Sequence, residues 1–481
     1  MSPATAIASL LFFSLLLLPQ FGTCHYTSYT SGSRKFFLRS SDDSRPSTSP
    51  AAASCSSISS GLSNGKLPLV HRLSACSPLN DDGGNSEPSP ADVLRRDAHR
   101  IGSLVAARSG VADAASPAPG RAPGGLVTVP TNGTPVATAP GVQDYTVLVG
   151  YGTPAQQLPL ALDTSLGISL LRCKPCASGA SNCDPAFDHT RSSTFAQVPC
   201  GSPDCRTNCS GSVCPLAPPF KRGTVVQDVL TLAPAAAVRD FAFGCVEVGS
   251  PGVKVAAGLL DLSRDSRSLA SRLAASPAKA PSFSYCLPLS RRSHGFLSVG
   301  AGRPAHRGGD RVTAPLVRNP AFPNMYFVEL TGISLGPDDL PIPPTAAMAN
   351  TTAIDAVTSF TFLKPAVYAA LRDAFRREMS RYPPAPAFQG LDTCYNFTGL
   401  EEVGMPLVGL KFGNGKTFAI EEGMMYYQDP SAAPFTVACL AFAPLPPDDQ
   451  PIAVIGTMAQ LSTEVVYDVS GGTIEFIPNS C

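Results

Sequence analysis

Short runs of β-forming residues, separated by Gly, Pro and Asn clusters, fill the chain from about residue 145 onward. Examples are residues 145–152, 240–248 and 464–469. Regular short strands with turn signals between them predict a mostly β body. Helix-spaced apolar residues interrupt this pattern at 268–276 and 365–382, where we expect two helices.

The chain before this body begins with a short apolar run over residues 7–19. The run is too short to span a bilayer, which needs ~20 residues, so we interpret residues 1–24 as a secretory signal peptide. No later stretch of the sequence reaches membrane-spanning length. Four N-x-S/T motifs fit the secretory route and are candidate glycosylation sites: Asn132, Asn208, Asn350 and Asn396.

A second segment precedes the body and reads as a propeptide with a linker, over residues 25–125. It opens with a Ser-, Thr- and Pro-rich stretch that lacks hydrophobic periodicity, which predicts a solvated segment. Residues 67–73 then favour a strand. A short amphipathic helix follows, with Pro90 near its start and Val93, Leu94 and Ile101 as its apolar positions.

Charge and cysteine content narrow the function class. The 481 residues carry 36 basic and 36 acidic side chains, so no global field attracts nucleic acid or an anionic membrane. Fifteen cysteines favour an oxidising compartment. Three of them, Cys24, Cys55 and Cys76, fall in the signal and pro regions. The remaining twelve are even in number and could form six disulfides.

An internal repeat carries the candidate chemistry. Residues 161–171 and 353–363 resemble one another, and each places an Asp after two apolar residues at a strand end. These are Asp163 and Asp355, which suggests two lobes that each supply one carboxylate. Two carboxylates a few ångström apart cannot both ionise, so they share a proton. One then acts as base on a water while the other polarises a peptide carbonyl, which is aspartic proteolysis.

From residue 66 to the C-terminus the sequence resembles the pepsin-like aspartic proteases, specifically the plant nepenthesin-like type. The resemblance rests on a set of segments that match landmarks of that family: VGYGTPAQQ, LRCKPC, FDHTRSSTFAQVPCGSPDC, FAFGC, FSYCLP, LDTCYNF and VIGTMAQLSTEVVYDV. Upstream, LVHRLSACSPL and ADVLRRDAHRI resemble the prosegment of one subfamily.

The resemblance implies a mostly β, bilobal fold with a cleft that holds an extended peptide or protein substrate. We expect an N-terminal lobe with a cysteine-rich insertion over residues 126–310 and a C-terminal lobe over 311–481. By the same analogy Cys394 pairs with Cys439. The family needs no cofactor and no metal, and we expect a secreted monomer located in the plant apoplast rather than in the vacuole or plastid, made as a zymogen.

The active-site loops depart from the family pattern of Asp, Thr or Ser, Gly, then Ser or Thr. In the first loop Thr164 is kept, Ser165 replaces Gly, and Leu166 replaces a hydroxyl, so we expect Asp163 to lose a hydrogen-bond partner. In the second loop Thr358 is kept. Ala356 removes a hydroxyl that would tie the two loops together. Val357 costs about 1–3 kcal/mol if the loop requires a Gly-only conformation.

Three further positions bear on catalysis. The apolar strand that threads past each loop ends in Gly456 in the second lobe but in Asp261 in the first, where a third carboxylate facing the dyad would perturb proton sharing. The flap segment, residues 214–228, lacks the family's Tyr, and Leu170 stands where the family has Trp.

The main hypothesis is therefore an aspartic endopeptidase family member with both Asp residues present and impaired catalysis. The alternative is a non-catalytic secreted binding protein on the same scaffold, similar to plant xylanase inhibitors, whose partner is a protein target.

Other motifs favour other chemistry only weakly. Cys173 and Cys176 form a C-x-x-C, for which a disulfide knot is the better interpretation than zinc. Residues 332–336 fit G-x-S-x-G but lead into a turn rather than a helix, which disfavours a nucleophile elbow. A small basic patch in the prosegment is made by Arg95, Arg96, Arg100 and Arg108, and we rank DNA binding low.

Overall fold

The structure is a computed structural model. It describes residues 27–30, 32–37, 66–72, 74, 76–79, 89–108, 145–176, 183–217, 223–233, 236–247, 256–274, 282–289, 293–300, 311–343, 346, 348, 350–429, 433–445 and 451–481. The signal-peptide prediction and Asn132 lie outside these residues. None of the helices in the described part of the chain is long and apolar enough to cross a membrane.

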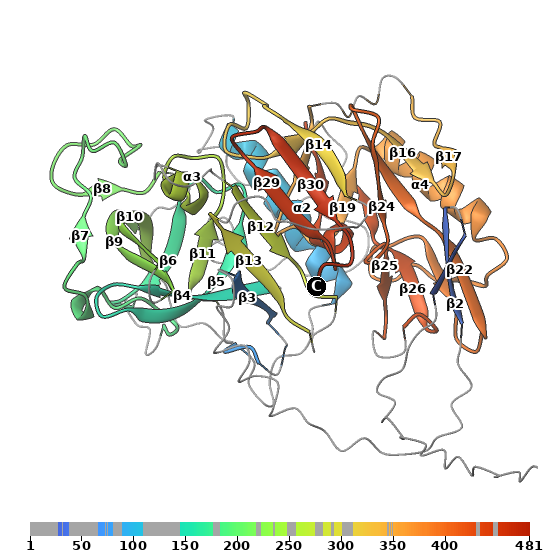
Figure 1. The fold of residues 1–481 in the computed structure, drawn as a ribbon, viewed down its shortest axis with the longest axis horizontal. Helices are drawn as coiled ribbons and strands as arrows, with labels where there is room; N and C mark the ends of the chain where they lie inside the picture. The colour runs from blue at the N-terminus through green and yellow to red at the C-terminus, as the bar shows by residue number, and fades with distance from the viewer. Residues whose placement is uncertain are drawn as a thin grey trace, which may run out of the picture.

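Two β-rich lobes make up the body, as the sequence predicted (Figure 1). The first lobe is built from β4 (Tyr145–Tyr151), β5 (Gln156–Asp163), β6 (Ser169–Cys173), β7 (Ala196–Gln197), β8 (Cys214–Pro215), β9 (Gly223–Ala233), β10 (Ala236–Glu247) and β11 (Gly258–Asp261). Its longest hairpin is β9–β10, in which Phe243 pairs with Val226.

The second lobe contains three groups of strands. Around the second Asp loop lie β15 (Phe327–Val328), β18 (Thr352–Ile354), β19 (Thr361–Leu363), β27 (Phe442–Pro444) and β28 (Ala453–Ile455). One four-stranded sheet holds β16 (Leu330–Leu335), β17 (Asp338–Asp339), β23 (Val408–Phe412) and β24 (Thr417–Ile420). The other holds β20 (Pro384–Ala385), β21 (Cys394–Asn396), β25 (Met425–Tyr427) and β26 (Val437–Leu440).

A sheet between the lobes combines strands from distant parts of the sequence. Its members are β3 (Lys66–His71), β12 (Ser282–Cys286), β13 (Gly295–Val299), β14 (Val312–Val317), β29 (Glu464–Asp468) and β30 (Thr473–Ile477). Strand β3 belongs to the segment we interpret as propeptide, and it pairs with both β13 and β4. The strand predicted over 67–73 is present over Lys66–His71, and it is integrated into the body.

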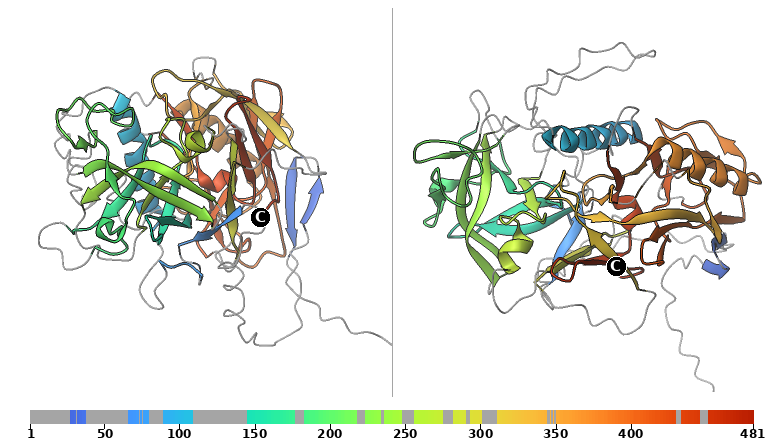
Figure 2. Two further views of the ribbon diagram at one scale, coloured as in Figure 1. Left: turned by 60° about the vertical axis from the view of Figure 1, so that its left-hand side comes forward. Right: turned by 90° about the horizontal axis from the view of Figure 1, so that it is seen from above.

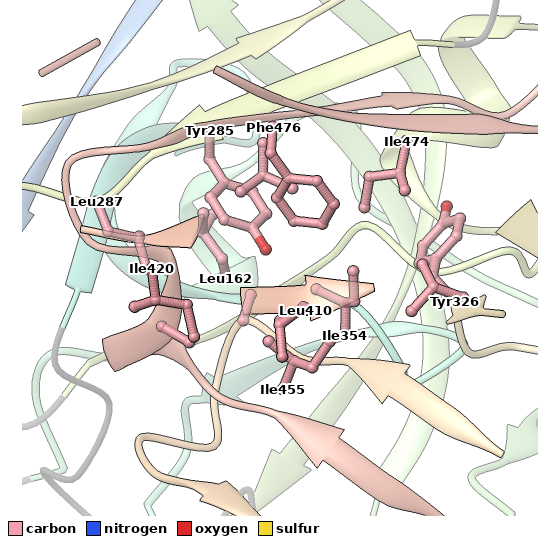
Figure 3. Packing of buried hydrophobic residues seen from close by; sticks show 14 of the residues in the cluster. Leu162, Tyr285, Leu287, Tyr326, Ile354, Leu410, Ile420, Ile455, Ile474 and Phe476 are labelled. Atoms are coloured by element: carbon pink, nitrogen blue, oxygen red, sulfur yellow. The ribbon is translucent and has the colours of Figure 1, made fainter. Parts of the chain in front are cut away.

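The buried core runs from the inter-lobe sheet into both lobes (Figure 3). Leu162 and Ile354, which immediately precede the two candidate Asp residues, are both part of this cluster, as are Tyr285 and Tyr326. Burying these apolar neighbours fixes the backbone on which each Asp is carried.

Three α-helices are described. Helix α3 (Leu269–Ala274) and helix α4 (Pro365–Glu378) lie where the apolar spacing predicted them. Helix α2 (Pro90–Arg108) is the predicted prosegment helix, with Pro90 as its first residue. Seen from above, α2 lies across the junction of the two lobes (Figure 2). It buries Val93 and Ile101 against residues of the second lobe.

All twelve cysteines from Cys173 onward are paired. The six disulfides are Cys173–Cys245, Cys176–Cys183, Cys200–Cys209, Cys205–Cys214, Cys286–Cys481 and Cys394–Cys439. The last of these is the pair expected from the family resemblance. The Cys286–Cys481 bond ties the C-terminus to the inter-lobe sheet.

Candidate active site

In each lobe the Asp lies at the end of a strand that pairs in parallel with another strand. This shared arrangement corresponds to the internal repeat in the sequence. In the first lobe β11 runs parallel to β5, and Asp261 lies opposite Asp163 in the register. In the second lobe β28 runs parallel to β18, with Ile354 opposite Ile455, so Gly456 follows at the position equivalent to Asp261. Both carboxylates are thus held at the ends of buried parallel strand pairs.

Asp163 is fully buried and has local hydrogen-bond partners. The backbone N–H of Ser165 donates to its Oδ1 at 2.8 Å, and the Ser165 hydroxyl donates to the same oxygen at 2.9 Å. The expectation that Leu166 deprives Asp163 of a hydroxyl partner is therefore wrong. The hydroxyl is supplied one residue earlier, because Ser165 replaces the family's Gly.

Asp355 is held in an equivalent manner by Thr358, whose N–H donates to Oδ2 at 2.9 Å and whose hydroxyl donates to it at 2.6 Å. Val357 is buried, and it is not among the residues with positive φ. The loop therefore does not require a Gly-only conformation at Val357, and the conditional strain cost does not arise.

The two Asp loops are tied together from one side. The backbone N–H of Ala356 donates to Thr164 Oγ1 at 3.2 Å, and that hydroxyl lies 3.4 Å from Asp355 Oδ1. Ala356 has no hydroxyl to return the contact to the first loop. The contact from Thr164 to the second loop is therefore kept, and the contact that a hydroxyl at residue 356 would make to the first loop is lost.

Gly456 is required where it stands. A Cβ added at this residue would lie 2.3 Å from the carbonyl oxygen of Phe360, and backbone cannot yield to it. The N–H of Gly456 donates to Thr361 Oγ1 at 3.2 Å. Behind it, the Gln460 amide donates to the carbonyl oxygens of Asp355, Ile455 and Gly456, which braces the second loop.

The two carboxylates converge on a single group, the guanidinium of Arg100 from helix α2. Arg100 Nη1 donates to Asp163 Oδ2 at 3.0 Å, and Nε donates to Asp355 Oδ2 at 2.8 Å. Nη2 reaches Asp355 Oδ1 at 2.9 Å, Asp163 Oδ1 at 3.2 Å and Ser165 Oγ at 2.9 Å. The planar fork of an arginine matches two carboxylates at once.

Burial and charge set the ionisation of this cluster. Burial would lower the pKa of Arg100, but the charges of Asp163 and Asp355 raise it, so Arg100 stays cationic. Burial would raise the pKa of Asp355, but the charge and hydrogen bonds of Arg100, together with the hydrogen bonds from Thr358, outweigh burial and hold that pKa below its usual range. With Arg100 in place the Asp355 carboxylate is therefore charged, and the guanidinium fills the space between Asp355 and Asp163.

The basic patch in the sequence includes Arg100 but does not predict its position between the two carboxylates. The signal was present in the helical spacing, since Asp97, Arg100 and Ile101 fall on the same face as Val93. All four side chains are at least nine-tenths buried. A charged pair placed within an apolar helix face indicates a buried counter-charge on the surface that receives it.

Asp97 docks the same helix on the second loop. Its Oδ2 accepts the backbone N–H of Ser359 at 2.7 Å and that of Phe360 at 3.0 Å. Arg96 pairs with Asp97 Oδ1 and donates to Ser359 Oγ at 2.6 Å. Burial raises the pKa of Asp97 to about 6, against the opposing effects of Arg96 and the two N–H groups. Helix α2 is therefore fastened to both lobes by polar contacts as well as apolar ones.

Asp261, the third carboxylate, does not bind to either Asp of the pair. Its Oδ1 accepts the N–H of Ser263 at 3.1 Å and that of Gly167 at 3.3 Å, and Ser263 Oγ lies 3.0 Å from its Oδ2. Burial, and after it the charge of Asp163, raises the pKa of Asp261 to about 8. A neutral Asp261 therefore braces the first loop through Gly167 without adding a third negative charge.

We expect Asp261→Asn to stabilise the protein near neutral pH. The unfolded carboxyl loses its proton near pH 3.8 and the folded one near 8, so unfolding becomes easier as pH rises through this interval. An amide does not ionise, and at pH 7 the variant should gain about 2–4 kcal/mol in unfolding free energy. Thermal melts should show a gap at pH 7 that closes by pH 4. The exposed Asp240→Asn is the control, and a gap independent of pH would contradict the prediction.

The flap region is described only at its base. Strands β8 and β9 pair there, and residues 218–222 lie outside the described residues. Leu170 is buried in a small cluster with Leu216 and Val225. A Cβ on Gly244 would lie 2.6 Å from Leu170 Cδ2, so this cluster is already full with a leucine in the position of the family's Trp.

The remaining predicted sites fall on the surface or in disulfides. Asn208, Asn350 and Asn396 are exposed. The C-x-x-C cysteines belong to two different disulfides, with Cys245 and with Cys183. The sulfurs of Cys200, Cys205 and Cys209 come within 4.8 Å of one another, but each is in a disulfide, so they do not offer thiolates to a metal. The G-x-S-x-G serine lies on β16, which turns directly into β17.

Comparison with known proteins places these features in a family. Residues 145–301 match the family described as Xylanase inhibitor N-terminal, and residues 325–478 match Xylanase inhibitor C-terminal. Aspartyl protease AED1 from Arabidopsis thaliana is 32% identical over 452 residues, covering 90% of each chain. Aspartic proteinase nepenthesin-1 from Nepenthes gracilis is 25% identical and covers 73% of this chain and 81% of its own.

Solved structures share the fold at lower identity. The crystal structure of edgp superimposes with a TM-score of 0.57 at 19% identity, covering 70% of this chain and 91% of its own. Conglutin gamma, a basic 7S globulin from lupine seeds, superimposes with a TM-score of 0.54 at 20% identity, covering 71% and 93%. These likenesses support the bilobal β architecture.

Proposed function

Because the chain belongs to the plant pepsin-like aspartyl protease family, we propose that it is the zymogen of an aspartic endopeptidase. The observation that carries the proposal is the convergence of Asp163 and Asp355 on one guanidinium. A pair of buried carboxylates that shares a cation can share a proton once the cation leaves.

The proposed mechanism uses the groups already in place. With Arg100 withdrawn, one of the two carboxyls holds a proton and the other is ionised. The ionised group takes a proton from a water that lies between them, and the protonated group donates to the carbonyl oxygen of the scissile peptide. Ser165 and Thr358 hold the two carboxyls in orientation through the hydrogen bonds described above.

In the proposed latent state of the zymogen, helix α2 blocks the active site. The helix lies across the lobe junction, and its Arg100 fills the space that the attacking water needs. A peptide substrate and α2 cannot occupy this site together. We therefore propose that processing between α2 and β4, within residues 109–144, and departure of the upstream segment open the site. Secretion to the apoplast and glycosylation at exposed Asn208, Asn350 and Asn396 complete the proposal, supported by the cysteine pairing and the N-terminal apolar run.

A non-catalytic binding protein is the second candidate function. It is favoured by Ala356, which leaves the tie between the loops one-sided, and by the match to families described as xylanase inhibitors. The flap lacks the family's Tyr as well. On this proposal the same body binds a protein target and hydrolyses nothing.

A cleavage assay separates the two candidates. The protein freed of residues upstream of β4 is incubated at about pH 3–5 with a denatured protein substrate, with and without a peptide-like transition-state mimic. Appearance of fragments, and their suppression by the mimic, is the expected result. A processed and folded protein that neither cleaves the substrate nor binds the mimic would contradict the endopeptidase proposal and favour the binding protein.

A further inference from the structure

A strand edge of the C-terminal lobe lies on the side of that lobe away from β9 and β10 (Figure 1). We call it the β22 edge, and define it as strand β22 (Glu402–Pro406) together with Glu421 and Glu422. In this structure it is covered by β2 (Ser33–Phe37), which is followed outward by β1 (Thr27–Thr30) (Figure 1). Both covering strands come from the segment upstream of the body.

Strand β22 is built to receive one more strand on one side. The backbone of Gly404 is held on the body side, where its N–H meets the Tyr382 hydroxyl and its carbonyl accepts from Arg381. On its other side β22 pairs antiparallel with β2, from Ser33 opposite Pro406 to Phe37 opposite Glu402. Among the described strands, β2 is the sole ladder partner of β22.

The Glu421 carbonyl oxygen and the Glu422 carboxylate form an acidic notch beside β22. This notch fixes the register in which β2 pairs with β22. Arg34 is buried, and its Nη1 donates to the Glu421 carbonyl oxygen at 2.7 Å and pairs with the Glu422 carboxylate. The Glu422 side chain is only 19% exposed, so its charge needs a cation close by. Arg34 also lies over the Phe36 ring, 4.8 Å from its centre, as residues two apart on one strand face do.

The notch is continuous with the surroundings of the second Asp loop. One cavity of about 220 Å³ is lined by Arg34, Phe36, Met405 and Glu422 and also by Ser359 and Phe360. Ser359 and Phe360 are the residues whose N–H groups hold Asp97 of α2, directly after the Asp355 loop. The same cavity therefore borders both the β22 edge and the residues that follow the Asp355 loop.

We propose that the β22 edge is an accessory substrate-binding site, which the chain's own residues 32–37 occupy until the upstream segment departs. Its ligand is an extended segment of a protein substrate that carries an arginine and, two positions later, an aromatic residue. Such a segment adds as a strand to β22 and places its guanidinium between the Glu421 carbonyl and the Glu422 carboxylate. The role in substrate binding rests on the proposed function, whereas the binding itself does not.

The test uses the full-length chain and a fluorescent peptide with the sequence of residues 30–38, TSGSRKFFL. Two variants release the chain's own β2 without altering the receiving surface. Gly32→Val places a Cβ 2.8 Å from the Gly336 backbone at a residue with φ of +82°, and Arg34→Glu opposes Glu422. Fluorescence polarisation should show both variants binding the peptide at least ten-fold more tightly than the wild-type chain.

Specificity is tested on both partners. In the Gly32→Val chain, adding Glu422→Gln should weaken binding at least ten-fold, while adding Glu401→Gln, an exposed neighbour of β22, should leave it unchanged. A peptide with Met in place of its arginine should bind at least ten-fold more weakly. Two folded open variants that fail to bind the peptide, or that bind the arginine-free peptide equally well, would overturn the proposal. Since no hydrolysis is measured, loss of the endopeptidase function would leave this result untouched.

Discussion

Replacing Arg100 with Met in the full-length chain is expected to expose the carboxylate pair without any processing. Arg100 is 3% exposed and contacts both Asp163 and Asp355. Removing one partner from a buried ion pair costs about 3–5 kcal/mol, because the remaining charges lose their compensation. Part of that cost is recovered only when α2 leaves and water or a ligand reaches the carboxyls. The free-energy difference that favours docked over undocked α2 should therefore become much smaller.

The measurement is binding of a peptide-like transition-state mimic to the uncut chain. We expect the Arg100→Met protein to bind it at least about 100-fold more tightly than the wild-type chain, which corresponds to about 3 kcal/mol. Arg95→Met is the matched control, because Arg95 is on the same helix, its side chain is 51% exposed and it pairs with Asp92. If Arg100→Met bound the mimic no better than Arg95→Met, the helix would not be what closes the site.

The second large effect is expected from the carboxylates themselves. In the processed protein, Asp163→Asn and Asp355→Asn should each lower the rate of peptide hydrolysis by about 10³-fold or more. Each change removes either the base or the acid of a step that requires both. An amide can accept the same N–H groups from Ser165 or Thr358, so the loops should keep their conformation.

This prediction is measured with initial rates on one peptide substrate at about pH 4, after cutting all proteins at a recognition sequence placed within residues 109–144. Asp240→Asn, an exposed carboxyl in the β9–β10 hairpin, serves as the matched control and should hydrolyse at the wild-type rate. Hydrolysis that survives in Asp163→Asn would show that the cleavage comes from a contaminating protease or from another site.

Much of the fold could be predicted from the sequence because its signals are local. The alternation of β-forming runs with turns, the helices at α3 and α4, and the prosegment helix all follow from periodicity within a few residues. The repeat around Asp163 and Asp355 also predicted an aspect of the tertiary fold. Two similar segments that each end a buried strand predict two similar lobes. The twelve cysteines from Cys173 onward likewise matched six disulfides.

The judgement on the active site could not be made locally. Position by position, Leu166 and Val357 suggested damaged loops, yet Ser165 supplies the hydroxyl for Asp163 and the backbone at Val357 is not in a Gly-only conformation. Asp261 also looked like an intruding charge, but its contacts are with Ser263 and Gly167. Whether a neighbouring side chain stabilises or perturbs a catalytic carboxylate depends on the direction in which that side chain points. The packed backbone sets this direction.

The sequence by itself determined the class of fold, the pair of aspartates and the presence of an amphipathic prosegment helix. Only the tertiary structure decided that Arg100 sits between the aspartates and that Arg34 fills the notch at Glu422. The physical reason is separation along the chain. Local propensity acts over a few residues, whereas these ion pairs join residues 63, 255 and 388 positions apart, and burial is what makes such pairings selective.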